Sequence, residues 1–338
     1  MRYTVLFFTL LLMCSCSSDP VAGEKINGVS FVALKDSIGP EEVAPVIGVN
    51  AGYASLMPFG FLEGPEAPKV VFNTSWQWFG ERGEGVRQYA ETLRQKGIRL
   101  MIKPHLWIGR GYFTGDLVMD DSAQWKVLED SYREYILYYA HLAEAVGAEW
   151  FCVGNELYGF AGNRPEFFRK LIAEVRSVYK GKVTYAENWD KYDKISFWDA
   201  LDMIGVNAYF PLSEAQTPEL SALVAAWEPH KEALRSCAQK FNKAVLFTEF
   251  GYRSMDHNAR APWDSSRDIE SINHTAQVNA LKALGSEIWS EEWFAGGFLW
   301  KWYPFHDRAG GSDNNRFTVQ NKPAQQVIRY LYDQKSRP

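Results

Sequence analysis

The feature of this sequence that most constrains its fold is a regular alternation of short apolar runs with longer amphipathic stretches. The runs are almost continuously apolar, which is typical of strands buried on both faces of a parallel sheet. We expect eight strands, at 28–33, 51–57, 99–105, 149–155, 182–187, 202–208, 244–250 and 297–302. Most of the intervening stretches carry a helical period, and we expect helices at about 82–97, 123–147, 165–179, 219–241, 269–287 and 323–335.

Eight such strands with helices between them predict the α/β class and a (β/α)8 (TIM) barrel. The alternative is an open doubly wound sheet, but no glycine-rich first turn that could bind a phosphate is present. A ninth apolar run, 70–73, is expected to belong to a long second loop. The loops at 58–69, 108–121 and 253–268 contain Gly and Pro and are candidate walls of a cleft.

The sequence of the N-terminus is typical of a targeting segment, which we do not expect to be part of the fold. Arg2 precedes an apolar run at 5–13, which is too short for a membrane span of about 20 residues. Ser15 and Cys16 follow and resemble a bacterial lipoprotein signal, with Cys16 as the lipidated residue. We therefore expect a signal peptide at 1–15, a linker at 16–24 and a single domain at 25–335. We expect the lipid alone to attach this domain to a bacterial envelope membrane, where it faces the periplasm or the cell surface. Plain secretion is the alternative.

Composition and motifs exclude several classes of function. The net charge of −5 argues against a nucleic-acid partner, which would require a basic surface. The six histidines have no metal-ligand spacing, and no motif for a nucleotide or dinucleotide is present, so we expect neither metal nor cofactor. Cys152 and Cys237 are expected to be buried thiols, although a disulfide between them is possible. Aromatic residues make up 15% of the chain, and their flat rings suit the C–H faces of sugars.

Two glutamates follow apolar runs at positions where a barrel places its active site. Asn155 and Glu156 come at the end of the fourth strand, and Glu249 at the end of the seventh, across the barrel mouth. Cleavage of a glycosidic bond requires two facing carboxyls, one protonated and one ionised. Either glutamate alone could equally be a surface acid or a charge at a helix N-terminus. Together they predict a glycosidase site.

Five stretches of the chain also carry a resemblance to a known family. They are 56–61, 103–107, 185–190, 204–212 and 247–252, and in this order they resemble glycoside hydrolase family 113 of clan A. The resemblance implies a retaining hydrolase of β-1,4-mannosidic bonds in mannan, glucomannan or manno-oligosaccharides, acting by double displacement. Many clan relatives carry His-x-Tyr after the sixth strand, where this chain has Asn207-Ala208-Tyr209.

The resemblance also implies roles for the residues at the strand ends. Glu156 would be the general acid and then the base, with its pKa raised by burial and by a neighbouring negative charge. Glu249 would be the nucleophile, and Tyr209 would hold it by a hydrogen bond. Asn155 would bind the sugar 2-hydroxyl.

Further residues at the strand ends and in the second loop are predicted to contact substrate. They are Lys103, His105, Trp107, Asn188, Trp189, Asn207, Trp300, Trp76 and Trp78. Several have alternatives: Lys103 could instead pair with an acid, for which Glu187 is a candidate, and the asparagines could satisfy loop backbone. Trp300 and Trp302, two apart on one strand, are expected to share a face, with Trp300 as the floor of the site.

The leading prediction is an endo-acting mannanase that works as a monomer on an oligo- or polysaccharide. Another clan A β-glycosidase, or an exo-acting enzyme that trims mannan, is the alternative within the class. A sugar-binding lipoprotein without catalysis is a different class, which has no need of paired acids. A structural envelope protein is a third class, which leaves the strand-end Trp and Lys residues unexplained.

Overall fold

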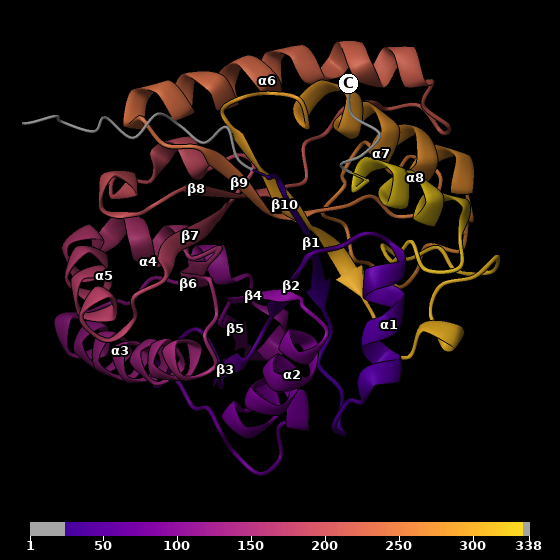
Figure 1. Ribbon diagram of the computed structural model, residues 1–338. Coiled ribbons are helices and arrows are strands. Elements are labelled where there is room, and N and C mark those ends of the chain that lie inside the picture. The colour runs from indigo at the N-terminus through magenta and orange to yellow at the C-terminus, as the bar shows by residue number, and fades with distance from the viewer. Residues whose placement is uncertain (1–23, 334–338) are drawn as a thin grey trace, which may run out of the picture.

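The computed structural model describes residues 24–333. For Arg110 it describes the backbone but not the side chain. Eight parallel strands form a closed barrel, each hydrogen-bonded to its neighbours, with β10 pairing β1 (Figure 1). The strands are β1 (Ile26–Phe31), β2 (Tyr53–Leu56), β4 (Arg99–Ile102), β6 (Trp150–Asn155), β7 (Lys182–Asn188), β8 (Ile204–Ala208), β9 (Val245–Phe250) and β10 (Phe294–Trp302). The eight predicted strands and the (β/α)8 fold are confirmed, and the open sheet is wrong.

Helices surround the barrel and connect its strands (Figure 1). They are α1 (Pro40–Gly48), α2 (Gly83–Gln95), α3 (Ser122–Ala145), α4 (Tyr158–Asn163), α5 (Pro165–Val178), α6 (Leu220–Phe241), α7 (His274–Ile288) and α8 (Pro323–Leu331). The six predicted helices are present with shifted ends, whereas α1 and α4 were not predicted. Pro45 lies inside α1 and obscures its helical pattern, although Pro40 and two glutamates form a favourable first turn. No helix of residues 24–333 is long and apolar enough to span a membrane.

A two-stranded parallel sheet beside the barrel was also missed by the sequence pattern. It pairs β3 (Phe59–Leu62) with β5 (His105–Ile108). The expected second and third strands ran to 57 and 105, but β2 ends at Leu56 and β4 at Ile102. Pro58 and Pro104 lie between the paired segments, and a proline has no N–H to continue a ladder. The run at 70–73 is a loop, as expected, apart from one bridge between Val71 and Phe61.

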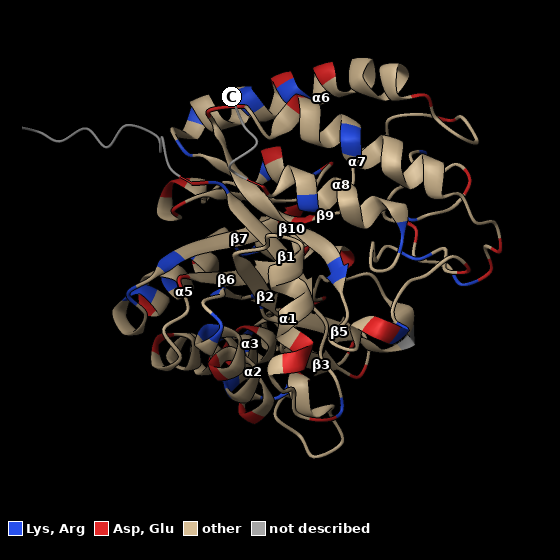
Figure 2. Ribbon diagram, turned by 45° about the vertical axis from the view of Figure 1, so that its right-hand side comes forward, with Lys and Arg blue, Asp and Glu red and all other residues tan. Residues whose placement is uncertain are grey.

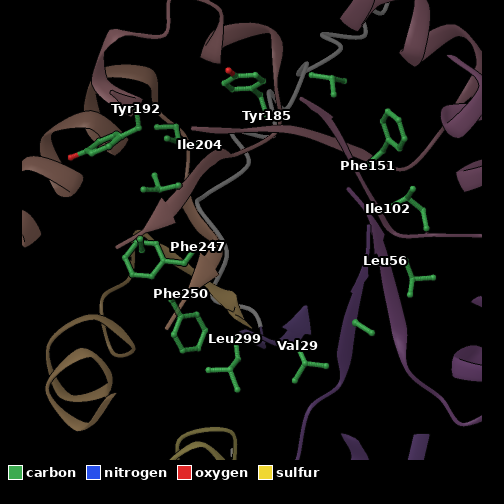
Figure 3. Packing of buried hydrophobic residues seen from close by; sticks show 14 of the residues in the cluster. Val29, Leu56, Ile102, Phe151, Tyr185, Tyr192, Ile204, Phe247, Phe250 and Leu299 are labelled. Carbon is green, nitrogen blue, oxygen red and sulfur yellow. The ribbon is translucent and has the colours of Figure 1, made fainter. Parts of the chain in front are cut away.

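The apolar core consists of a large layer between barrel and helices and a smaller cluster at the amino ends of the strands. Figure 3 shows part of the large layer, with Val29, Leu56, Phe151 and Phe247 contributed by four different strands. The small cluster closes the amino end with Ile26, Tyr53, Met101, Trp150, Met203, Leu246 and Phe298. Cys152 and Cys237 are buried free thiols, so the predicted thiols are confirmed and the disulfide is not formed.

The charged residues lie mostly on the helices and connecting loops (Figure 2). Against this pattern, Lys103 and Glu249 are buried beside the barrel strands, 0% and 5% exposed. Burial of a charge is costly unless the charge is paired. These two buried charged residues therefore indicate that the candidate site lies at the carboxyl ends of the strands. The predicted signal peptide and Cys16 lie outside the described residues.

Candidate active site

Glu156 and Glu249 line one cleft at the carboxyl ends of the strands. Glu249 is the fifth residue of β9, and Glu156 directly follows β6 with a left-handed φ of 53°. Such a conformation is uncommon for a residue other than glycine and occurs often at functional sites. The cleft has a volume of about 570 Å³. Its other lining residues are Phe113, Asn188, Trp189, Asp190, Tyr209, Trp263, Ser265, Trp300 and Phe317.

Glu249 is held by a cation and a hydroxyl donor. The Lys103 ammonium lies 2.6 Å from Oε1, and the Tyr209 hydroxyl donates to Oε2 at 2.7 Å. Both contacts stabilise a negative charge on the carboxylate. Burial and the negative charge of Glu249 raise the pKa of Tyr209 well above its usual range, so the phenol keeps its proton and can donate. The hydrogen bond expected from Tyr209 to Glu249 is therefore present.

Glu156 has a different environment. It is partly buried, and its one hydrogen-bond donor among residues 24–333 is the Asn207 amide, which lies 2.6 Å from Oε1. Burial and the negative charge of Glu249 raise the pKa of Glu156 to about 7. A large part of Glu156 is therefore protonated near neutral pH. A protonated carboxyl beside an ionised one is the arrangement that general acid catalysis requires.

Asn207 connects the two carboxyls. Its amide nitrogen donates to Glu156 and, at 2.9 Å, to Asn155 Oδ1, while its oxygen accepts from Lys103 at 3.2 Å and from Thr248 Oγ1 at 2.9 Å. The side chain is fully buried, so it has no surface left for a sugar. The prediction that Asn207 contacts substrate is therefore wrong, because Asn207 positions the residues that line the cleft.

Lys103 is likewise buried by its partners. Its side chain is 0% exposed and ends between Glu249 and Asn207. The predicted sugar contact is corrected to the alternative, an ion pair with an acid. That acid is Glu249, so the pairing with Glu187 is also wrong.

His105 directs an unpaired ring nitrogen toward the site. Its Nε2 lies 3.8 Å from Glu249 Oε1, is buried, and has no hydrogen-bond partner among the described residues. Burial, together with the positive charge of Lys103, lowers the pKa of His105 well below its usual value, so the ring is neutral. The imidazole lies parallel to the Trp300 indole, with an interplanar angle of 5° and centroids 6.2 Å apart. A buried polar atom without a partner is suited to a ligand that supplies one.

Glu187 forms a buried network behind Glu156. It accepts from the Tyr185 hydroxyl at 2.7 Å and from the Asn188 N–H at 2.9 Å. Tyr185 in turn accepts from the N–H of Leu157, the residue after Glu156, at 3.0 Å. Burial raises the pKa of Glu187 to about 7. Glu187 does not line the cleft, and its network fixes the backbone beside Glu156.

Comparison with known proteins identifies the family. The sequence model of glycoside hydrolase family 113 matches residues 41–322 of this chain. The chain belongs to glycoside hydrolase family 113. It is therefore a glycoside hydrolase, as its sequence predicted. A comparison with curated protein sequences gave no match.

Solved structures share the fold of this hydrolase. The family 113 β-mannanase AaManA from Alicyclobacillus acidocaldarius, solved in complex with ManMIm, has a TM-score of 0.80 at 24% identity, over 93% of this chain and 99% of that one. A complex structure of a family 113 β-1,4-mannanase has a TM-score of 0.77 at 24% identity, over 93% of this chain and 100% of that one. A β-glucuronidase from Faecalibacterium prausnitzii gives 0.60 at 15% identity, over 91% of this chain and 49% of that one.

The remaining predicted residues of the family 113 hydrolase divide into two groups. Asn188, Trp189 and Trp300 line the cleft, whereas Asn155 is not among its lining residues and accepts a hydrogen bond from Asn207. The second group, which does not line the cleft, consists of the exposed tryptophans Trp76, Trp78 and Trp107.

Trp300 and Trp302 do not share a face. Trp302 is fully buried and stacks on His306, whereas Trp300 is partly exposed in the cleft. The pairing of β10 with β1 shifts register between Leu299 and Trp302, and such an irregularity breaks the simple alternation of side chains.

Several cleft residues of this hydrolase were not predicted individually. Trp263 stacks on Trp189 with centroids 5.4 Å apart and an interplanar angle of 20°. Trp263 and Ser265 come from the loop at 253–268, and Phe113 from the loop at 108–121, both predicted as cleft walls. Arg253 holds the first of these loops, because its guanidinium donates to the carbonyls of Asp264 and Ser266. The loops were visible in the sequence, but the direction of each side chain depends on such tertiary contacts.

Proposed function

We propose that this hydrolase cleaves β-1,4-mannosidic bonds in mannan, glucomannan or manno-oligosaccharides with retention of configuration. The observation that carries the proposal is the pair of carboxyls on one cleft with opposite environments. Glu249 has a lysine and a hydroxyl as partners, whereas Glu156 has one amide and a pKa raised to about 7. The similar family 113 structures are named β-mannanase and β-1,4-mannanase, which supports the choice of sugar.

In the first step Glu249 attacks the anomeric carbon. A bond forms from that carbon to a Glu249 oxygen, the bond to the leaving oxygen breaks, and Glu156 gives its proton to that oxygen. The Lys103 ammonium and the Tyr209 hydroxyl orient Glu249 before the attack.

In the second step water attacks the same carbon from the opposite face. Glu156, now ionised, takes the proton from water, and the bond between the sugar and Glu249 breaks. Glu156 recovers its proton and Glu249 its negative charge. Two inversions at one carbon leave the configuration unchanged.

Other groups on the cleft or next to it are suited to hold the sugar during these steps. Trp300 and Trp189 offer ring faces to the C–H surfaces of the pyranose. The Asn155 oxygen is occupied by Asn207, and its amide N–H groups have no hydrogen-bond partner among residues 24–333, so they can donate to the 2-hydroxyl. The unpaired nitrogen of His105 can accept or donate one further hydrogen bond to a hydroxyl. Asn188 is a further candidate for a hydroxyl contact.

A product profile tests the proposal. The purified enzyme is incubated with mannan, glucomannan, cellulose and mannotetraose, and the products are separated over time, with Glu249→Gln as the control. We expect mixed oligosaccharides from mannan, little from cellulose, and none with the variant. Release of mannose or mannobiose alone would indicate an exo-acting enzyme. Cleavage of cellulose but not mannan would support another β-glycosidase, and binding without products would support a sugar-binding protein.

The predicted lipid anchor remains a separate proposal. Cys16 lies outside the described residues, and its role rests on the sequence pattern alone. Cells that express the full chain are fractionated, and the Cys16→Ala variant is the comparison. We expect the unchanged protein in the membrane fraction and the variant in the soluble fraction, and equal distribution of both would contradict lipidation.

A further inference from the structure

One face of the β3–β5 sheet is built from aromatic rings. Phe59 pairs with His105 in register, and Phe61 pairs with Trp107. Alternate residues of a strand project to the same face, so these four rings lie together. Their centroids are 5.4 Å apart for Phe59 and His105, 5.9 Å for Phe61 and Trp107, and 6.1 Å for Phe59 and Phe61.

This face connects the cleft with the exposed surface. At its inner end His105 stacks on Trp300, which lines the cleft. At its outer end Trp76 packs edge-on against Phe61 with centroids 4.6 Å apart. Exposure rises along the path, from 7% for His105 to 51% for Trp107 and 60% for Trp76. We call the rings of Phe59, Phe61, Trp76, His105 and Trp107 the aromatic ledge.

The aromatic ledge is held rigidly from beneath. The Tyr135 hydroxyl on α3 lies within hydrogen-bond distance of two carbonyls, 3.0 Å from that of Pro58, which directly precedes β3, and 2.9 Å from that of His105 in β5. The buried Gln77, next to Trp76, donates to the Phe59 carbonyl at 2.9 Å. A surface that is ordered before binding loses less entropy when a ligand binds. The backbone beneath the ledge is thus held in place, while Trp76 and Trp107 remain more than half exposed among residues 24–333.

We propose that the aromatic ledge binds the part of a β-1,4-linked mannan chain that extends out of the cleft. This proposal rests on the proposed function and names where the substrate continues. A neutral polymer of pyranose rings suits the ledge, because each ring has an apolar face and none of the ledge positions is an acid, a lysine or an arginine. Continuity through Trp300 places this surface beside the reacting sugar.

The test compares a long substrate with a short one. Trp76→Ala, Trp107→Ala and the double variant are assayed on mannan and on dinitrophenyl β-mannobioside, which is too short to extend far beyond the cleft. We expect KM on mannan to rise roughly 3- to 10-fold for each single variant and more for the double variant, with kcat/KM on the aryl substrate unchanged. Trp107→Phe should restore most of the affinity. Tyr330→Ala removes an exposed aromatic ring from α8 and serves as the control.

Each outcome decides between the two proposals. If the unchanged enzyme cleaves no mannan, the proposed function fails. If it cleaves mannan and the variants leave KM on mannan unchanged, only the ledge proposal fails. Equal losses on both substrates would mean that the tryptophans support the fold, which also overturns the ledge. Retardation of Glu249→Gln in a native gel containing mannan, abolished by the double substitution, would support it independently of turnover.

Discussion

Glu156 and Glu249 are the same type of residue on one cleft, yet their surroundings are opposite. The end of β9 gives Glu249 the Lys103 ammonium at 2.6 Å and the Tyr209 hydroxyl at 2.7 Å. The end of β6 gives Glu156 one amide, in a partly buried position near the negative charge of Glu249. A nearby cation favours the ionised form of a carboxyl, whereas burial and a nearby negative charge raise its pKa and favour the protonated form. The comparison shows that position in the barrel, and not residue type, gives the two carboxyls the different environments on which their proposed roles as nucleophile and acid depend.

The largest expected effect comes from removing the group that attacks. Glu249→Gln keeps the size of the side chain but leaves no carboxylate to form the glycosyl-enzyme. We expect kcat/KM on mannan to fall on the order of 10⁴-fold or more, measured by reducing-sugar release. Glu287→Gln on α7 is the matched control, since its carboxylate pairs with Lys231 outside the cleft. Near-normal turnover by Glu249→Gln would remove Glu249 from the reaction.

The next effect tests the other member of the pair. Glu156→Gln is expected to lower kcat/KM about 10²- to 10⁴-fold on mannan, because the leaving sugar needs a proton. A dinitrophenyl leaving group needs none, so its release in the first step should be affected little. In the unchanged enzyme kcat/KM should fall as pH rises through about 7, where Glu156 loses its proton. A high-pH limb that persists in Glu156→Gln would assign it to another group.

A third substitution removes the difference between the two sites. Lys103→Met leaves Glu249 buried without its cation, and breaking a buried pair costs about 3–5 kcal/mol of stability. We expect a clear drop in the free energy of unfolding and about a 10²-fold loss of kcat/KM. The control is Lys126→Met, whose pair with Asp130 on α3 is solvent-exposed and should contribute little to stability. Equal losses in the two variants would mean that burial of Lys103 has no special role.

The smallest effect on activity is expected from a substitution of Glu187, which lies behind Glu156. The pKa of Glu187 is raised to about 7, so between its ordinary value and 7 the folded protein holds a proton that the unfolded chain has lost. Stability should therefore decrease as pH rises through this range, and Glu187→Gln should reduce the decrease from pH 5 to pH 8 by on the order of 2–3 kcal/mol. Urea unfolding at both pH values measures it, with the exposed Glu91→Gln as the control. The activity of Glu187→Gln should change only a few-fold. A pH dependence of stability that is the same in this variant as in the unchanged protein would contradict a buried, protonated Glu187.

The sequence predicted the barrel because its signal is local. Continuous apolar runs and helical periods need only neighbouring residues, and the rule that sites lie at carboxyl ends then identified Glu156 and Glu249. The β3–β5 sheet was missed because Pro58 and Pro104 divide what reads as one apolar run into two strands. The repeated pattern of a proline followed by four mostly apolar residues was the available signal.

The roles of Lys103 and Asn207 could not be predicted in the same way. Both lie at the carboxyl ends of strands and both are polar, so the sequence fits a sugar contact as well as a buried partner. What decides is the depth of each side chain and the atoms it meets, and those atoms come from residues about 50 to 150 positions away. The same holds for Trp263, whose direction depends on how Arg253 ties its loop.

The most direct test of the paired carboxyls is the configuration of an azide product. Glu249→Ala and Glu156→Ala are each incubated with dinitrophenyl β-mannobioside and sodium azide, and the anomer of the glycosyl azide is determined by proton NMR. If Glu249 is the nucleophile, azide replaces it and gives the α-azide after one inversion. If Glu156 is the acid and base, its variant still forms the glycosyl-enzyme and gives the β-azide after two inversions. The same anomer from both variants, or the reverse assignment, would contradict the account.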